Sequence, residues 1–249
     1  MTLPQTNEKI HKQDETSPGA PAQRISVVIP CYNEAQALPA ILSAIPKSIS
    51  EVIVVDNGST DDSGQIAQKF FARVVHENIK GYGSAILTGI QHASGDIIAL
   101  FDGDGTYPIE DFMKALIFMR DHDLDFLSGC RFPLSDETKA MPIVNQWANH
   151  GISWLTAILF RIHLKDSQSG LMIFKKRLFD KIHVNNKGMG FSQELKIKAW
   201  LVNNARCSEM HIHYNSRIGE SKFRKIPDGL KNLFAVFKLY FDMKMNKKH

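Results

Sequence analysis

Cysteine is scarce in this sequence of 249 residues. The three cysteines, Cys31, Cys130 and Cys207, are odd in number and lie far apart without metal-type spacing, which argues against a disulfide framework or a zinc site. An excess of charge is also lacking, because 30 Lys and Arg against 26 Asp and Glu leave a formal net charge of only +4. So weak a charge does not indicate a nucleic-acid-binding protein.

Long hydrophobic runs are missing as well. The stretch from Met141 to Phe160 has no formal charge, but its first half is polar and only Ile152–Phe160 is strongly apolar. A membrane-spanning helix needs roughly 20 predominantly apolar residues, so we expect none. Residues 1–23 mix charged residues with Pro and Gln, and we expect a disordered tail there rather than a signal peptide.

The sequence does contain a regular alternation of strand-like and helix-like segments. Short apolar runs predict strands at Ser26–Pro30, Glu51–Asp56, Val74–His76 and Asp96–Phe101. Helical patterns between them predict helices at Ala35–Ile45, Gln65–Ala72 and Gly83–Ala93. Continuous apolar strands with intervening helices indicate an α/β fold, a Rossmann-like unit whose mostly parallel sheet is covered on both faces.

After residue 130 the alternation weakens. The pattern predicts helices at 143–163, 176–183 and 190–203, a strand near 206–214 and a last helix from about 228. Because no repeat or interdomain linker is visible, we expect one domain over residues 24–226. Residues 227–249 are expected to form a basic amphipathic helix.

Polar loops follow three of the predicted strands, at 31–34, 56–62 and 102–105. In parallel α/β sheets, ligands bind beyond the carboxyl ends of the strands. Asp102 and Asp104 lie one residue apart, with glycines at 103 and 105, and two such carboxylates suit a hard divalent cation, Mg²⁺ or Mn²⁺. The same residues are also typical of a solvated turn, so this pair alone leaves both interpretations open.

Three residues of the first two loops suit a nucleoside. Tyr32 can stack on a base, Glu34 can bind a hydroxyl, and Asp56 can accept hydrogen bonds from a base or ribose, although its loop also fits a simple turn with a helix cap. Lys80 precedes a glycine at a helix start and can neighbour a phosphate or a sugar. Its segment is not a dinucleotide fingerprint, because Ile86 stands at the third glycine position.

Taken together, these loops resemble the family 2 glycosyltransferases of the GT-A fold, in the segments SVVIPCYNE, EVIVVDNGSTDDS, KGYGSAILTG and FDGDGTYP. Four later segments look like the subgroup of dolichol-phosphate mannose and glucose synthases: SGCRF (128–132), DSQSG (166–170), GFSQE (190–194) and RIGESKF (217–223). The resemblance covers residues 25–225 approximately and keeps the order of the motifs.

The resemblance implies an inverting, metal-dependent transfer of mannose or glucose from GDP-mannose or UDP-glucose to a polyprenyl phosphate. By similarity, Asp102 and Asp104 would bind the metal, but Thr106 stands where some relatives have a Gln ligand. The nucleotide sugar would contact Pro30, Tyr32, Glu34, Asp56, Lys80, Asp102 and Asp104.

The later motifs imply the remaining roles. Arg131, Lys165 and Ser169 would bind the acceptor phosphate, with Lys165 at a position where relatives often have Arg. Arg217 and Lys222 would stabilise the leaving diphosphate, so that Asp102, Asp104, Arg131, Arg217 and Lys222 would form the catalytic group. Asp166 and Glu194 are either sugar contacts and bases or simply structural carboxylates.

The chain ends in a basic segment. Its Phe-rich helical stripe and the apolar segment Ile152–Phe160 suit either packing on the domain or contact with a membrane surface. We expect peripheral attachment to the cytoplasmic face of a membrane. A membrane-protein partner also fits this location. Three other functions stay open: a family 2 transferase with a sugar hydroxyl acceptor, a non-catalytic nucleotide-sugar-binding subunit, and a sugar nucleotidyltransferase.

Overall fold

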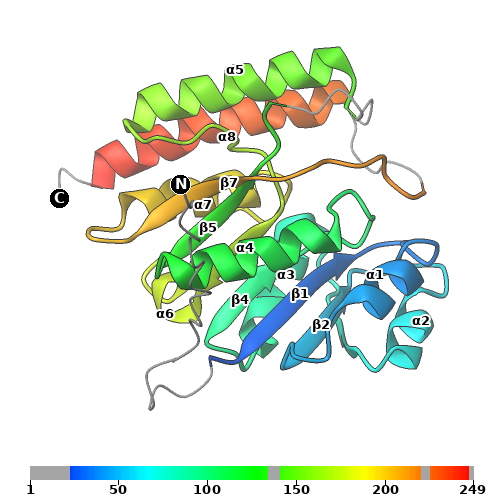
Figure 1. Cartoon of the computed structure of the whole chain (residues 1–249). Coiled ribbons are helices and arrows are strands. Elements are labelled where there is room, and N and C mark those ends of the chain that lie inside the picture. The colour runs from blue at the N-terminus through cyan, green and yellow to red at the C-terminus, as the bar shows by residue number, and fades with distance from the viewer. Residues whose placement is uncertain (1–22, 134–140, 220–224, 247–249) are drawn as a thin grey trace, which may run out of the picture.

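The structure is a computed structural model that describes residues 23–133, 141–219 and 225–246. Its core is a seven-stranded sheet in the order β3-β2-β1-β4-β6-β5-β7 (Figure 1). The strands are β1 (Ile25–Cys31), β2 (Glu51–Asp56), β3 (Arg73–His76), β4 (Ile97–Leu100), β5 (Phe126–Cys130), β6 (Met172–Lys175) and β7 (Cys207–His211). β6 runs antiparallel to β4 and β5, and the other pairings are parallel. The expected α/β fold with a mostly parallel sheet is confirmed.

Helices cover both faces of this sheet. They are α1 (Leu38–Ala44), α2 (Ser63–Lys69), α3 (Tyr82–His92), α4 (Ile109–Asp121), α5 (Ile143–Phe160), α6 (Lys176–Phe179), α7 (Phe191–Leu201) and α8 (Lys225–Asn246). Buried side chains of α1, α2 and α4 pack on one face and those of α3, α6 and α7 on the other. Within β1, Val27 and Ile29 face the first cluster and Val28 faces the second, which explains why this strand is apolar throughout.

The long helices α5 and α8 lie side by side along one side of the molecule, away from β2 and the helices α1 and α2 (Figure 1). α8 also packs against α7. α5 ends three residues before the predicted boundary, because Arg161 adopts a left-handed backbone conformation with φ 55°. Across the described ranges, no helix is both long enough and apolar enough to cross a membrane.

The sequence patterns missed three elements and misplaced some ends. No strand was predicted at β5 or β6, and no helix at α4. α6 ends at Phe179 rather than 183, and α8 begins at Lys225 rather than near 228. The predicted tail lies outside the described residues except for residue 23.

Candidate active site

The carboxyl ends of β1, β2 and β4 are neighbours and place their polar loops together. Parallel pairing sets Cys31 opposite Asp56, and Val28 opposite Leu100. A cavity of about 310 Å³ opens at this edge. It is lined by Pro30, Cys31, Tyr32, Glu34, Asn57, Lys80, Gly81, Tyr82, Ala85, Asp102, Gly103, Asp104, Met189 and Arg217. The structure therefore brings together seven of the residues that the sequence singled out, contributed by four loops.

Asp102 is one of the two aspartates that line this cavity. The hydroxyl of Tyr82 donates a hydrogen bond of 3.0 Å to its Oδ1. Burial and, to a smaller extent, the nearby Asp104 carboxylate raise the pKa of Asp102 to about 7, against the opposing effects of the Tyr82 hydrogen bond and of Arg217. A carboxylate in such surroundings gains stability from a nearby cation.

Asp104 has its two oxygens in different surroundings. Its Oδ1 accepts hydrogen bonds from the backbone N–H of Thr106 at 3.0 Å and from the Thr106 hydroxyl at 2.7 Å. Thr106 is itself buried, so here its hydroxyl orients Asp104. The other oxygen, Oδ2, lies 2.7 Å from Nη1 of Arg217.

Arg217 reaches the site from the far end of the sequence. The backbone N–H of Ile218 bonds to the carbonyl of Asp104 at 2.9 Å, and that of Asn215 bonds to the carbonyl of Thr106 at 2.8 Å, so the two segments run side by side. The guanidinium then bridges Asp104 and Glu34, its second ion-pair partner. Its Nε is buried and has no hydrogen-bond partner among the described residues. The single positive charge of Arg217 is thus shared between two carboxylates.

The outer part of the cavity combines an aromatic ring with a cation. Nζ of Lys80 lies 5.6 Å from the ring centre of Tyr32. The side chain of Asn57 accepts a hydrogen bond from Gly81 N–H and donates to the carbonyls of Glu77 and Ile79. Asn57 therefore holds the loop that carries Lys80. This geometry suits a stacked ring next to an anionic group.

Asp56 occupies a different position from the one expected. It is absent from the residues that line the cavity, although the next residue, Asn57, is present. Its carboxylate accepts a hydrogen bond of 2.8 Å from Ser59 N–H and lies 3.4 Å from Nδ1 of His76. These contacts are those of a loop-stabilising residue, and a contact between Asp56 and a nucleoside stays a prediction.

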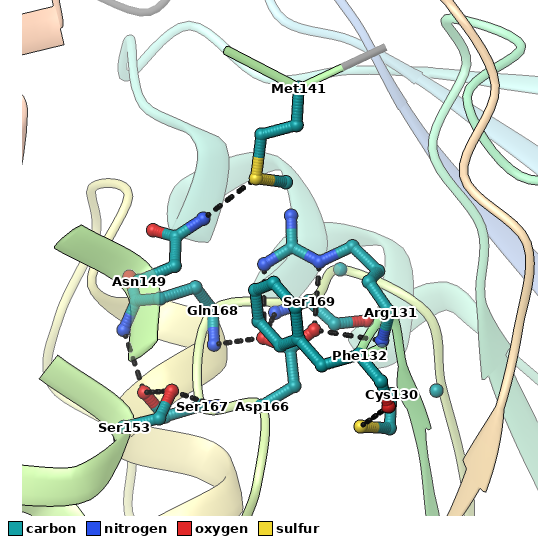
Figure 2. Close-up of polar contacts among 12 residues, drawn as sticks. Cys130, Arg131, Phe132, Met141, Asn149, Ser153, Asp166, Ser167, Gln168 and Ser169 are labelled. Carbon is teal, nitrogen blue, oxygen red and sulfur yellow. Dashed lines mark hydrogen bonds and ion pairs between the residues drawn. The ribbon is translucent and has the colours of Figure 1, made fainter. Parts of the chain in front are cut away.

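Arg131 and Asp166 form a buried ion pair with two side-chain hydrogen bonds, of 2.8 Å from Nε and 2.9 Å from Nη2 (Figure 2). The backbone N–H of Arg131 bonds to the same carboxylate at 3.0 Å. Burial alone would raise the pKa of Asp166, but Arg131 holds it well below its usual range. Asp166 therefore stays ionised and fixes the guanidinium, which is a structural role for this carboxylate.

The loop that follows Asp166 is in contact with Asp102. Ser169 is buried, and its hydroxyl has no hydrogen-bond partner in the described part of the chain. Gly170 packs directly against Asp102, because a Cβ on Gly170 would lie 2.4 Å from Asp102 Oδ2. The backbone N–H of Gly170 is bonded to the hydroxyl of Tyr107 at 2.8 Å. Ser169 is therefore next in sequence to a residue in contact with Asp102, although neither Arg131 nor Ser169 is among the residues that line the cavity.

The remaining candidate residues do not line the first cavity in the part of the chain that the structure describes. Lys165 lines a second, larger cavity of about 590 Å³ beside β7, together with residues such as Arg161, Trp200 and Glu209. Lys222 lies outside the described residues. Glu194 accepts hydrogen bonds from the backbone N–H groups of Asn185 and Asn186, so in this structure it holds the loop that carries Met189 to the cavity.

Sequence reasoning missed Asn57, Tyr82, Tyr107 and Met189. Asn57 and Tyr82 lie inside two of the motifs that carry the family resemblance, so their location after a strand and at a helix start was the available signal. Met189 has no local pattern that reveals it, because only the packing of its loop on Gly81 and Gly83 brings it to the cavity.

A separate surface is formed by the outer faces of α5 and α8. Trp147 and Trp154, seven residues apart on one face of α5, are 75% and 68% exposed. Further exposed apolar side chains on the two helices are Ile143, Val144, Ile158, Phe234, Phe237, Phe241 and Met245. α5 carries no formal charge, whereas α8 presents exposed lysines including Lys238 and Lys244. We call these residues the α5/α8 surface.

Comparison with known proteins gives consistent results. Residues 26–183 match the family described as Glycosyl transferase family 2. An uncharacterized glycosyltransferase of Mycobacterium tuberculosis is 33% identical over 199 residues, which cover 78% of this chain and 87% of the relative. A dolichyl-phosphate hexose transferase of Haloferax volcanii is 31% identical over 208 residues, covering 82% and 89%.

Solved structures give the same fold. Glucosyl-3-phosphoglycerate synthase from Mycobacterium tuberculosis, in complex with Mn²⁺, UDP and glucosyl-3-phosphoglycerate, superposes with a TM-score of 0.67 at 19% identity. The match covers 88% of this chain and 80% of that one. The same enzyme with Mg²⁺ and UDP gives a TM-score of 0.69 at 18% identity, covering 88% and 79%.

Proposed function

This chain belongs to glycosyltransferase family 2 and has the GT-A fold, and from that premise we propose that it transfers mannose or glucose from a nucleotide sugar to a polyprenyl phosphate. The donor would be GDP-mannose or UDP-glucose, and the anomeric configuration would invert. The similarity to a dolichyl-phosphate hexose transferase supports the acceptor class.

One relationship carries this proposal. Asp102 lines the cavity proposed for the nucleotide sugar, and the same carboxylate contacts Gly170, the residue after Ser169, and is close enough to the buried Arg131 for the charge of Arg131 to lower its pKa. An acceptor phosphate at Arg131 and Ser169 would therefore approach a sugar whose diphosphate lies near Asp102 and Asp104. The unpartnered, buried hydroxyl of Ser169 supports an acceptor contact there, since buried polar groups are normally satisfied.

Asp102 and Asp104 fit a divalent cation. Within the described ranges, no group of three or more His, Cys, Asp and Glu residues forms a complete metal site. Two carboxylates suffice for Mg²⁺ or Mn²⁺ when diphosphate oxygens and water complete the shell. When bound, the cation would neutralise charge on the leaving diphosphate.

The protein's own residues would do the rest. Tyr32 and Lys80 would form the wall for the base and neighbouring phosphate, with Pro30 and Glu34 beside them. Arg217 would leave its carboxylate partners to pair with the diphosphate as negative charge develops there. A phosphate monoester is already largely dianionic at pH 7, so an oxygen held by Arg131 would attack the anomeric carbon without a general base.

The α5/α8 surface supports peripheral attachment to a membrane. Tryptophan and phenylalanine side chains are favoured at the lipid–water boundary, and lysines next to them are attracted to anionic lipids. We assign this surface to the cytoplasmic leaflet, whose lipids are anionic and where a membrane-protein partner would also be within reach. A polyprenyl phosphate resides in such a bilayer, so the acceptor site would lie close to its substrate.

A transfer assay tests the function. Radiolabelled GDP-mannose, UDP-glucose and UDP-GlcNAc are each incubated with the protein, Mn²⁺ and polyprenyl phosphate in vesicles. Label in the organic phase is the expected product, and Asp104→Asn should reduce its formation by about 100-fold or more. Asp62→Asn is the control, because Asp62 is exposed and its side chain makes no capping bond at α2.

The outcomes separate the alternatives. If label transfers only to a sugar hydroxyl acceptor in water, the polyprenyl phosphate assignment is wrong. If nucleotide sugar binds and no acceptor receives label, the protein is a binding subunit. Release of pyrophosphate would instead indicate a nucleotidyltransferase.

A further inference from the structure

The loop at 165–170, which carries Ser169 and Gly170 against the reaction site, is held almost entirely by side chains. Each of its six backbone N–H groups donates to a side-chain oxygen at 2.6–3.1 Å. The acceptors are, in chain order, Glu209 twice, Ser153, Asp166 twice and Tyr107. The buried Nζ of Lys196 also donates to the carbonyl of Asp166 at 2.9 Å. The position of the loop therefore depends on the elements that supply these side chains.

Two of those elements are the helices of the α5/α8 surface. From α5, the buried Ser153 accepts the N–H of Ser167 at 2.9 Å, and the two hydroxyls lie 3.1 Å apart (Figure 2). From α8, the buried Asn232 donates a hydrogen bond of 2.9 Å to the side-chain oxygen of Gln168. Both contacts arise from the inner sides of helices whose outer sides carry the exposed aromatic residues.

The contacts form a continuous path to the site. Ser167 and Gln168 are the two residues before Ser169, and the following Gly170 is in contact with Asp102. A shift of α5 or α8 relative to the sheet would therefore move the loop at its centre. Small displacements of reacting groups lower rates strongly, since about 1 Å can cost on the order of 100-fold.

We infer that Ser153 and Asn232 are positioning residues. When the α5/α8 surface binds to a bilayer, their hydrogen bonds to the loop at 165–170 would fix the position of that loop beside the acceptor phosphate. The inference rests on the proposed function, because it takes polyprenyl phosphate as the acceptor and a membrane as the surface. On this inference, membrane contact does more than concentrate the enzyme near its substrate. It also sets the geometry of Ser169 and Gly170 and thereby the rate of transfer.

The test compares two acceptors for the full-length protein. One is a long-chain polyprenyl phosphate in anionic vesicles, and the other is a ten-carbon isoprenyl phosphate dissolved in buffer, assayed with and without lipid vesicles. Wild type is expected to show a kcat for the short acceptor that rises severalfold when empty vesicles are added. Ser153→Ala and Asn232→Ala should not be stimulated by empty vesicles. Their kcat with the vesicle-bound acceptor should be about tenfold lower than that of wild type, with KM for the nucleotide sugar unchanged.

Asn149→Ala is the matched control, because this α5 residue bonds to the sulfur of Met141 instead of to the loop. Vesicle sedimentation and circular dichroism confirm that the variants bind and fold as wild type does. Equal losses with and without vesicles, or a wild type that vesicles do not stimulate, would overturn the inference. Absence of transfer to either acceptor would instead refute the proposed function.

Discussion

Arg217 and Asp104 are joined by a 2.7 Å ion pair and both line the 310 Å³ cavity, although 113 positions separate them in the sequence. The same guanidinium pairs with Glu34. The Arg217 guanidinium therefore pairs with one carboxylate oxygen of Asp104, a residue proposed to bind Mg²⁺ or Mn²⁺. For the metal and the diphosphate to bind, this ion pair must be exchanged.

Arg217→Ala should consequently have opposite effects on metal binding and on turnover. Without the guanidinium, Asp104 and Glu34 lose their positive partner, so Mn²⁺ should bind the nucleotide-free protein severalfold more tightly in calorimetry. The developing charge on the diphosphate loses a stabilising group, so kcat should fall by about 100-fold or more. Arg73→Ala, which removes an exposed ion pair with Glu51, should change neither value. Weaker Mn²⁺ binding in Arg217→Ala would contradict the exchange.

Gly170 is expected to be essential because of its packing against Asp102. Its φ lies outside the left-handed region, so alanine meets no backbone strain, but the added Cβ would lie 2.4 Å from Asp102 Oδ2 and 2.9 Å from the Tyr82 hydroxyl. Gly170→Ala should therefore fold, yet displace Asp102 and lower kcat by at least about tenfold, with weaker Mn²⁺ binding.

Gly151→Ala gives the control for this substitution, because a Cβ added to Gly151 in α5 would have no neighbouring atom within 4 Å among the described residues. It should leave kcat unchanged and raise the free energy of unfolding by about 0.5–1 kcal/mol, as expected for alanine in a helix. An active Gly170→Ala with normal Mn²⁺ binding would show that Asp102 is free to move away.

Lys196 should give the stability of the protein a dependence on pH. Burial lowers the pKa of Lys196 to about 8, against the raising effects of Asp166 and Glu209 and with a smaller lowering effect of Arg131. The ordinary pKa in the unfolded chain is about 10.4, so between these values the unfolded state binds more protons. The Lys196 contribution to the free energy of unfolding should therefore rise from pH 8 to pH 10, by no more than about 3 kcal/mol.

Denaturant unfolding of wild type and Lys196→Met at pH 7, 8, 9 and 10 measures this contribution. The free energy of unfolding of wild type minus that of Lys196→Met should rise from pH 8 to pH 10 and stay constant below pH 7. Lys69→Met, at an exposed position near the end of α2, is the control for general charge effects. Parallel curves for wild type and Lys196→Met would show that Lys196 does not titrate there.

Much of the fold could be predicted from local patterns. β1, β2 and β4 are continuous apolar runs because both faces of the sheet are covered, and each prediction fell within two residues of the observed strand. β5 and β6 were missed although neither is shorter than the correctly predicted β4, and their pairing with each other and with β4 and β7 joins segments distant in sequence that local patterns do not connect. α4 was missed although its buried Phe112, Ala115 and Met119 follow helical spacing.

The candidate site was predictable where loops follow strands. The cavity contains Tyr32, Glu34, Asp102 and Asp104, all of which lie within about four residues of a strand end. The contact partners were not predictable, because nothing local pairs Arg131 with Asp166 or Arg217 with Glu34. Those contacts depend on how segments far apart in the sequence pack together.

Trp147 and Trp154 should supply much of the affinity for membranes. A tryptophan buries about 150–250 Å² when covered, which at about 25 cal/mol per Å² corresponds to several kcal/mol for full burial and about 2 kcal/mol for partial insertion. Trp147→Ser and Trp154→Ser should therefore each weaken sedimentation with anionic vesicles by at least about tenfold.

Phe71→Ser is the matched control, because Phe71 is 98% exposed but lies in the turn between α2 and β3, away from α5 and α8. If exposure alone caused membrane binding, Phe71 would contribute as much as the tryptophans. Weaker vesicle binding by Phe71→Ser, or unchanged vesicle binding by the tryptophan variants, would therefore contradict a membrane contact through α5. Binding by wild type should also weaken with salt, because Lys238 and Lys244 attract anionic headgroups at a distance that ions screen.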